Sequence, residues 1–535
     1  MPHRRFLALL TFLSASAAVG QVPDVPDLPI PDAFIRDILT EVSSEAALEH
    51  TRALASRVRY PGSRGFLESA EYVAAQARLV GLVNIRIERF AGERSSWDPV
   101  AGELELVEPE RRRLASFQDT AVLIAEGSMD GDVTAELVDV GQGNSEAIYS
   151  GKDVRGKILL ADGSPGRVWQ AMGQRGAVGV LSAASEGFFG RRPAEDAVSW
   201  GQSPPDALAM MISRKQAEEL RLMLRQGKTV RLRMRVQASR SERAEIGMVM
   251  GEIPGEVKGQ DVVLVSHLDH QKPGANDNAS GSGTLLEALA TLKRLVAAGK
   301  VPPPRRTLRF WWSTEIASEK AFFQRHPQEA RSILLAVNLD QAGGDRNAEN
   351  NFAIIYGPEW LPSFDDDLIH SLAEHMKDRY APAEQAPLML FVAPRGSRTS
   401  FRPAYWKNMP LSDHVAFQAK EVGIFCISMG VPSLHVIHTD QDSVDRIDPT
   451  WLKRSALMTL APALWAANAG SAEARRLLGY VFRRARVRLA ESAEPDKQLE
   501  LEERRLDSVR AFDAGLSAES YKQKLRALAE VLSRE

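Results

Sequence analysis

The sequence predicts an α/β protein built around a mostly parallel sheet that helices cover on both faces. From Ile246 to about Ala467, short apolar runs of strand length alternate with stretches of helical periodicity. That alternation is typical of buried parallel strands joined by helices. With 535 residues, 44% of them hydrophobic, the chain can bury more than one core. We therefore expect several domains.

Changes of composition along the chain predict where these domains begin and end. The predicted segments are a signal peptide at 1–20, the first part of the main domain at 21–97, a β-rich insertion at 98–237, the second part of the main domain at 238–470, and a charged helical extension at 471–535. The main domain is thus expected to be interrupted once.

The amino terminus has the order of segments that a secretory signal peptide needs. Basic residues at 3–5 precede an apolar run from Phe6 to Leu13, and small residues follow. This run is too short to span a bilayer, which takes about 20 residues. We expect cleavage after about Ala17 or Gly20 and a secreted or periplasmic protein without a transmembrane anchor. An uncleaved anchor is the alternative.

Composition excludes several other classes of protein. The net charge is only −3, from 67 Lys and Arg against 70 Asp and Glu, which gives no electrostatic case for a nucleic-acid partner. Cys426 is the only cysteine, so no intramolecular disulfide can form. It lies in an apolar stretch, where a buried, inert thiol is expected.

Local patterns predict individual elements outside the second part of the main domain. From Asp32 to about Leu82 the apolar spacing is helical, with Tyr72, Ala75 and Leu79 on one face. In the insertion the patterns predict strands at 135–140, 157–161 and 177–181 and a helix at 168–173. Past Ser471 the chain is densely charged and helical, and we expect solvated faces on a helical appendage, with a partner-binding role as the alternative.

The residues that carry chemistry begin at the end of a predicted strand, Val262–Val265. His267 and Asp269 follow it two residues apart, so both project to one side at the carboxyl end of the strand, where ligands bind in open α/β sheets. A polar loop then leads into a helix whose apolar positions are Leu285, Leu289 and Leu292. Asp277 lies just before this helix, where capping of the helix is the structural alternative to a metal ligand.

Five short motifs together resemble those of the bacterial two-zinc aminopeptidases and their glutamate carboxypeptidase II-like relatives. In chain order they are SHLDH at 266–270, GANDNASG at 274–281, NLD at 338–340, SDHVAF at 412–417 and HTDQDSVDRID at 438–448. The resemblance covers about 35–92 and 246–467. It implies a zinc-exopeptidase fold for the main domain.

Carried over residue by residue, the resemblance also implies a metal site. His267 and Asp340 would bind one ion, Asp277 would bridge two ions, and His438 would bind the second. Asp269 would hydrogen-bond the far nitrogen of His267 and orient it. Imidazole and carboxylate ligands suit zinc, so one or two zinc ions are expected. His435 is the rival of His438, and His270 and His414 are expected to be ordinary or supporting residues.

The chain departs from the family pattern at Glu315. The family carries two adjacent glutamates here, a general base followed by a ligand of the second metal, whereas this chain has only Glu315. In one register Glu315 is the base and Ile316 replaces the ligand. In the other Glu315 is the ligand and Thr314, far too weak a base, occupies the base position. Glu319 could substitute, although a solvated helix residue is expected there.

The insertion has a resemblance of its own. The stretches 153–160 and 175–181 are similar to the protease-associated domain that many members of this family carry, which would overhang the cleft without a catalytic role. The function implied is a secreted zinc metallopeptidase, an aminopeptidase acting on peptides or small proteins. The alternatives are a catalytically impaired peptide-binding protein and a single-zinc acyltransferase of the glutaminyl cyclase kind.

Overall fold

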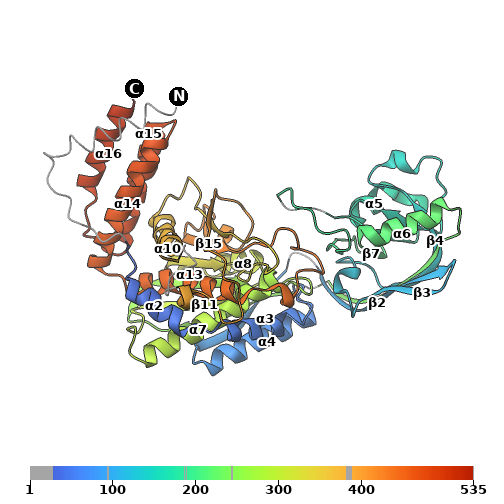
Figure 1. Cartoon of the computed structure of the whole chain (residues 1–535), viewed down its shortest axis with the longest axis horizontal. Coiled ribbons are helices and arrows are strands. Elements are labelled where there is room, and N and C mark those ends of the chain that lie inside the picture. The colour runs from blue at the N-terminus through green and yellow to red at the C-terminus, as the bar shows by residue number, and fades with distance from the viewer. Residues whose placement is uncertain are drawn as a thin grey trace.

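The computed structural model describes residues 28–92, 95–185, 187, 189–242, 245–380 and 388–533. They form a main body around an eight-stranded sheet, a second body with a seven-stranded sheet, and a group of C-terminal helices (Figure 1). The predicted signal peptide lies outside the described residues. Within the described part, no helix combines the length and the apolar character needed to cross a membrane.

The main sheet confirms the predicted α/β class. Its strands, in spatial order, are β1 (Val83–Ala91), β9 (Glu245–Ile253), β11 (Arg306–Ser313), β10 (Val257–His267), β12 (Ile333–Leu339), β15 (Phe425–Gly430), β13 (Phe352–Ile355) and β14 (Pro403–Trp406). The four central strands β11, β10, β12 and β15 are parallel. The sheet is mixed, because β1, β9 and β11 pair antiparallel on one side and β13 pairs antiparallel with β15 on the other.

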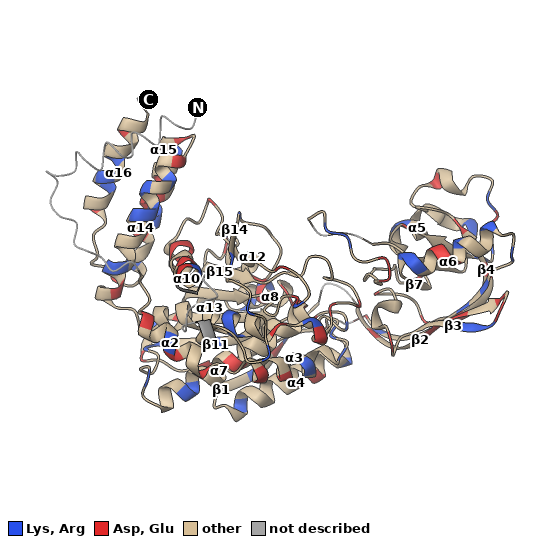
Figure 2. Cartoon of the chain, viewed as in Figure 1, with Lys and Arg blue, Asp and Glu red and all other residues tan. Residues whose placement is uncertain are grey.

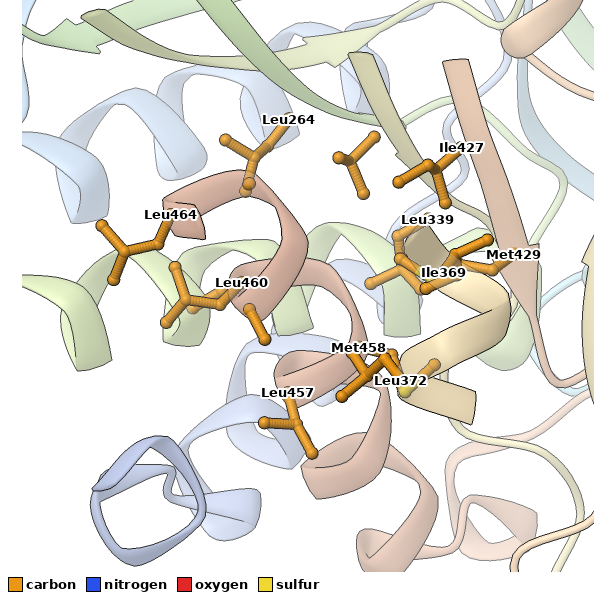
Figure 3. Packing of buried hydrophobic residues seen from close by; sticks show 14 of the residues in the cluster. Leu264, Leu339, Ile369, Leu372, Ile427, Met429, Leu457, Met458, Leu460 and Leu464 are labelled. Carbon is orange, nitrogen blue, oxygen red and sulfur yellow. The ribbon is translucent and has the colours of Figure 1, made fainter. Parts of the chain in front are cut away.

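Helices cover both faces of this sheet, as predicted. One face carries α2 (Asp32–Glu41), α3 (Ser44–Ala55), α4 (Arg64–Leu79), α7 (Gly281–Ala297), α10 (Phe364–Tyr380), α11 (Leu388–Phe391) and α13 (Pro449–Asn468). The other carries α8 (Ala317–Arg325), α9 (Pro327–Ala330) and α12 (His414–Phe417). Each face of the sheet packs against its helices in a hydrophobic core. Successive residues of β10 point into alternate cores: Leu264 packs in the first and Val265 in the second. Figure 3 shows α13 and α10 packed on the strands in the first core.

Helix α4 buries a different face from the one that Tyr72, Ala75 and Leu79 share. Leu79 is 79% exposed and Ala75 is exposed as well. The buried positions are Phe66, Ser69, Ala70, Val73, Ala74 and Ala77. Small residues pack this helix closely against its neighbours, and the larger side chains that suggested the other face remain near solvent. The predicted helix is therefore confirmed, and its buried face is formed by other residues than Tyr72, Ala75 and Leu79.

The second body lies between the two parts of the main body in the sequence. Its strands, in spatial order, are β3 (Arg112–Ser116), β2 (Ser96–Glu108), β8 (Arg231–Ser241), β4 (Gly131–Asp139), β5 (Ile158–Ala161), β6 (Gly179–Ser182) and β7 (Ala209–Met211), with helices α5 (Pro165–Met172) and α6 (Arg214–Arg225). The three predicted strands correspond to β4, β5 and β6, and the predicted helix to α5. The exact domain boundaries stay predictions.

The C-terminal helices are α14 (Ser471–Glu491), α15 (Pro495–Ser508) and α16 (Glu519–Leu532), and Figure 2 shows charges of both signs along them. Not all of these charges are solvated. Arg488 of α14 contacts the buried carboxylate of Asp367 in α10 at 2.6 Å and that of Glu502 in α15 at 2.7 Å. Buried charges need such partners, so the extension is attached to the main body through α10.

Candidate metal centre

The predicted ligands converge where parallel strands end. His267 is the last residue of β10, and Asp340 directly follows Leu339, the last residue of β12. Glu315 comes two residues after Ser313, the last residue of β11. Because these strands are parallel neighbours, their carboxyl ends meet at one edge of the sheet, the usual place for a ligand in such folds.

The loop that carries Asp277 is tied to two of these strand ends by Asn278. Its Nδ2 donates to Ser266 Oγ at 3.0 Å and to the carbonyl oxygen of Leu339 at 3.2 Å. Its Oδ1 accepts the backbone N–H of Gln341 at 3.0 Å. One buried amide therefore links the ends of β10 and β12 and fixes the distance between His267 and Asp340.

Asp442 fixes the same loop from the other side. Its carboxylate accepts the backbone N–H of Asn276 at 2.8 Å and that of Asp277 at 3.1 Å. Asp277 does not cap α7, whose N-cap residue is Ser280 without a side-chain cap. The structural alternative of capping is therefore wrong, and the Asp277 carboxylate is directed at imidazoles instead.

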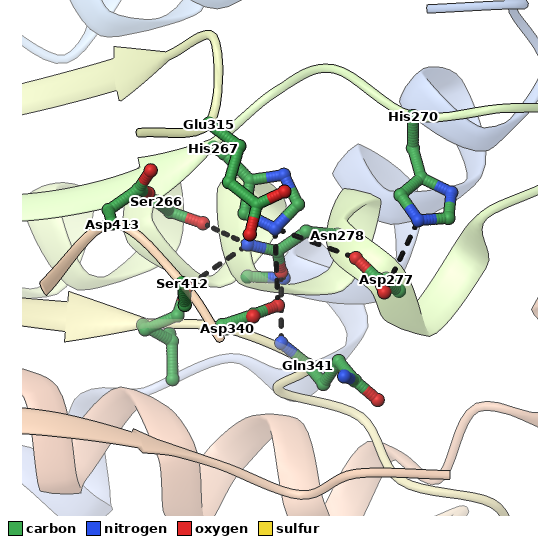
Figure 4. A network of polar contacts seen from close by, with 12 residues as sticks. Ser266, His267, His270, Asp277, Asn278, Glu315, Asp340, Gln341, Ser412 and Asp413 are labelled. Carbon is green, nitrogen blue, oxygen red and sulfur yellow. Dashed lines mark hydrogen bonds and ion pairs between the residues drawn. The ribbon is translucent and has the colours of Figure 1, made fainter. Parts of the chain in front are cut away.

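A first triad consists of His267, Asp277 and Asp340, whose ligand atoms lie within 4.8 Å of one another. His267 Nε2 lies 3.3 Å from Asp340 Oδ1 and 3.5 Å from Asp277 Oδ1 (Figure 4). The far nitrogen, Nδ1, lies 3.1 Å from the backbone oxygen of Asp269 and 3.8 Å from its carboxylate. Asp269 thus orients His267 through its carbonyl, rather than through the side chain that the resemblance implies.

A second triad consists of His270, Asp277 and His438, again within 4.8 Å. His270 Nε2 lies 3.2 Å and His438 Nε2 lies 3.5 Å from Asp277 Oδ2. The two triads therefore use different oxygens of one carboxylate. The sequence motifs did not assign His270 to a metal, although its place three residues after His267 was a signal that could have been tested.

The distances in both triads suit zinc. Two ligands held about 2.1 Å from a tetrahedral zinc ion lie about 3.4 Å apart. The four measured separations between imidazole nitrogen and carboxylate oxygen fall between 3.2 and 3.5 Å. Hydrogen-bonded pairs elsewhere in this chain are closer, at 2.8 Å for His435 and Asp345 and 2.6 Å for His326 and Glu88. The donor set and its spacing thus fit zinc in both triads.

The electrostatics of the site also favour a cation. Burial opposes a proton on His267, yet the carboxylates of Glu315 and Asp340 raise the pKa of its imidazole well above the usual value. Burial raises the pKa of Asp277, but His270 and the other two imidazoles hold it well below the usual value. Burial raises the pKa of the Glu315 carboxyl well above its usual range. Carboxylates outnumber cations here, and a metal ion would offset that excess.

Glu315 faces the site from a sharp turn after β11. Its backbone N–H donates to Asp269 Oδ1 at 2.8 Å, and the next N–H, of Ile316, donates to Asp413 Oδ1 at 2.7 Å. Ile316 has a φ of 61°, which is rare for a β-branched residue and marks a backbone held by its surroundings. Among the described residues, neither triad includes Glu315.

The other candidates at this turn lie elsewhere. The Thr314 hydroxyl donates to the carbonyl oxygen of Gly247 at 3.1 Å, so it is directed at β9. Glu319 is 0% exposed, so the prediction of a solvated residue is wrong. Burial raises the pKa of its carboxyl well above the usual value, and Asp413 adds to this shift. The rival histidine His435 pairs with Asp345 and belongs to neither triad.

A small apolar cavity of about 110 Å³ adjoins the triads. Asp277, Glu315, Asp340 and His438 are among the residues that line it. The remaining walls are mostly apolar and include Phe189, Ile355, Trp406, Leu411, Met429, Leu434 and Ile437. Phe189 comes from the insertion and packs against Trp406 with ring centroids 5.7 Å apart. A larger, open depression in the insertion contains no member of either triad.

The insertion also contacts the loop that carries His438. The backbone N–H of Trp200 donates to the carbonyl oxygen of His438 at 2.7 Å, and the two rings pack edge to face with centroids 5.2 Å apart. Asp440 Oδ1 accepts the N–H of Val198 at 2.9 Å. His438 itself has a φ of 58°, in the left-handed region. The insertion thus supports one ligand of the second triad.

Comparison with known proteins shows which family the main body is similar to. Residues 248–462 match the family described as Peptidase family M28. We call this part of the chain the M28 domain, after the family that it is similar to. The matched range contains all the ligands of both triads together with Glu315.

Individual relatives are distant. Leucine aminopeptidase 1 of Aspergillus oryzae is 34% identical over 117 residues, which cover 19% of this chain and 29% of that protein. A Peptidase M28 precursor from Shewanella amazonensis has a TM-score of 0.57 at 17% identity, covering 82% of this chain and 96% of that one. A zinc aminopeptidase from Bacillus subtilis has a TM-score of 0.54 at 18% identity, covering 79% and 94%. These two structures support the same fold for the M28 domain.

Proposed function

We propose that this protein is a secreted zinc metallopeptidase that removes amino-terminal residues from peptides. The observation that carries the proposal is the pair of triads on the two oxygens of Asp277, located in an M28 domain. His267, Asp277 and Asp340 would hold zinc in the first triad. Zinc in such a site supplies a Lewis acid that polarises a carbonyl group and activates water.

The residues of the chain supply the remaining functions. The Glu315 carboxylate lines the cavity beside both triads and would accept the proton that the attacking water loses. Asp269 fixes the backbone of Glu315 and the ring of His267, so it is a positioning residue. Asp277 and Asp340 keep His267 in place through its Nε2.

The size of the cavity supports action at the end of a peptide. An apolar cavity of about 150 Å³ can hold a benzene ring. The cavity here is about 110 Å³ and mostly apolar, which suits one aliphatic side chain such as that of leucine. This agrees with the name of the Aspergillus oryzae relative, a leucine aminopeptidase. Export is proposed because residues 1–20 have the order of basic, apolar and small segments that a signal peptide needs.

The experiment compares the purified wild-type protein with Glu315→Gln and His267→Ala. We expect wild type to contain zinc and to hydrolyse leucyl arylamide, with the activity lost on chelation and restored by zinc. Glu315→Gln should keep its zinc and lose about two to four orders of magnitude in kcat, the usual contribution of a general base. His267→Ala should lose metal as well. Wild type that binds zinc and peptide without hydrolysis would instead support the binding-protein alternative.

A further inference from the structure

We infer that His270 replaces the missing second glutamate and completes a second zinc site with Asp277 and His438. This inference rests on the proposed function only in assuming that the chain binds zinc. With Glu315 as the base and outside both triads, the family pattern leaves that site with two ligands in this chain, too few to hold zinc tightly. The structure provides a third ligand, His270, to which the family motifs assign no role at the metal.

The geometry of Asp277 separates the two sites. Its Oδ1 is the oxygen near His267, and its Oδ2 is the oxygen near His270 and His438. Figure 4 shows His267 and His270 reaching Asp277 from different sides. Both imidazoles of the second triad present Nε2 to the same oxygen, at 3.2 and 3.5 Å, close to the separation of about 3.4 Å between ligands of one tetrahedral ion.

The position of His270 is fixed by the main chain. Its N–H donates to the carbonyl oxygen of Arg59 at 3.0 Å, and the N–H of Arg59 donates back to His270 at 2.9 Å. The Arg59 guanidinium is buried and donates to the carbonyl oxygens of Leu268 at 2.8 Å and Gly274 at 2.9 Å, on either side of His270. The imidazole is therefore presented by a braced segment, as a metal ligand needs.

Gly274 leaves room for this ring. A Cβ atom there would come within 2.7 Å of His270 Nδ1 and 2.6 Å of the carbonyl oxygen of Asp277, and the residue has a φ of 47°. Glycine is the residue that accepts both constraints. The loop before Asp277 is thus shaped around the His270 side chain.

Replacing a carboxylate by an imidazole changes what the site prefers. The second triad carries two neutral donors and one carboxylate, whereas the family pattern would supply two carboxylates and one imidazole. Imidazole suits zinc, copper and nickel, while magnesium and manganese prefer oxygen ligands. The second site should therefore select zinc over manganese. Glu315 is released from the ligand role and remains available as the base.

Metal analysis of the full chain tests the assignment. Wild type equilibrated with zinc should bind two ions per chain, and His270→Ala should bind one. The matched control is His375→Ala, because His375 lies 3.1 Å from Asp32 in a similar pair outside both triads. This control and Glu315→Gln should both keep two ions. One ion in wild type, two in His270→Ala, or one in Glu315→Gln would each overturn the inference.

A second measurement needs no variant and covers the case in which His270→Ala does not fold. Zinc X-ray absorption of the wild-type protein should show three imidazoles shared by two ions; two imidazoles would exclude His270. Hydrolysis is measured separately on the same samples. Two ions with three imidazoles but no turnover would leave this inference standing and remove the proposed function. Hydrolysis by a protein in which His270 does not bind the metal would overturn this inference and leave the proposed function standing.

Discussion

The two triads share one carboxylate but are held by different kinds of structure. His267 ends β10 and is 1% exposed, and Asp340 follows the neighbouring parallel strand β12. In the second triad, His270 lies outside the strands and is held by an isolated β-bridge to Arg59 and by the guanidinium of that residue. His438 lies in a loop with a left-handed backbone, and its side chain is 26% exposed.

This difference separates a site made by the sheet from a site made by loops. The register of β10 and β12 fixes His267 and Asp340 as soon as the sheet forms, whereas Asp277 joins both triads from its loop. The second triad requires two further contacts to form: the bridge to Arg59 and the contact of Trp200 with the His438 loop. We therefore expect the first site to bind zinc more tightly than the second.

Asp277→Asn should have the largest effect, because it removes the feature that both triads share. An amide presents one oxygen in place of two equivalent anionic oxygens, so it cannot serve both sites. Both zinc ions should be lost at micromolar zinc, and kcat/KM should fall by about three orders of magnitude or more. The measurements are zinc per chain and hydrolysis of leucyl arylamide. Asp32→Asn, outside both triads, should change neither. Retention of one tightly bound ion in Asp277→Asn would show that the sites do not share this residue.

Trp200→Ala should lower the zinc affinity of the second site and leave that of the first site unchanged. The variant removes the ring that packs edge to face on His438 at 5.2 Å and keeps the backbone hydrogen bond. Such an aromatic pair contributes about 0.5–1.5 kcal/mol, so zinc affinity at the second site should fall by roughly 2- to 10-fold. Affinity at the first site should not change. Stepwise zinc titration measures both.

The control for this variant is another tryptophan of the insertion. Trp169 in α5 donates to Asp206 and contacts neither triad, so Trp169→Ala should leave both affinities at the wild-type values. An equal loss at both sites in Trp200→Ala would mean that the insertion supports the M28 domain generally, without a specific role at His438.

The positions of His267 and Asp277 could be predicted from local sequence, whereas their roles as metal ligands came from the family resemblance. The apolar run of β10 and the helical spacing of Leu285, Leu289 and Leu292 in α7 place His267 and Asp277 at the ends of buried elements. Alternation along the strands then determines which side chains enter the same edge of the sheet. The α/β class followed from the same apolar patterns.

The second site depends on contacts that local patterns do not contain. The ligand position of His270 follows from pairing with Arg59, far away in the sequence, and from the space at Gly274. The buried state of Glu319 and the inward face of α4 are likewise set by neighbours that only the tertiary structure brings together. The helical spacing of apolar residues does not tell which of two faces of a helix is buried when the buried face consists largely of small residues.

Thr314→Val should have the smallest effect and should separate the two registers for Glu315. The hydroxyl of Thr314 donates to the carbonyl oxygen of Gly247, and its removal leaves that buried acceptor with one partner fewer. The free energy of unfolding should fall by about 1 kcal/mol, measured by urea denaturation. The value of kcat/KM should stay within about twofold of wild type, since Thr314 is directed at β9, away from the cavity.

Glu315→Gln should show the opposite pattern, with stability retained and turnover lost. A large loss of turnover in Thr314→Val at full zinc content would place Thr314 at the reacting atoms and return Glu315 to the role of ligand.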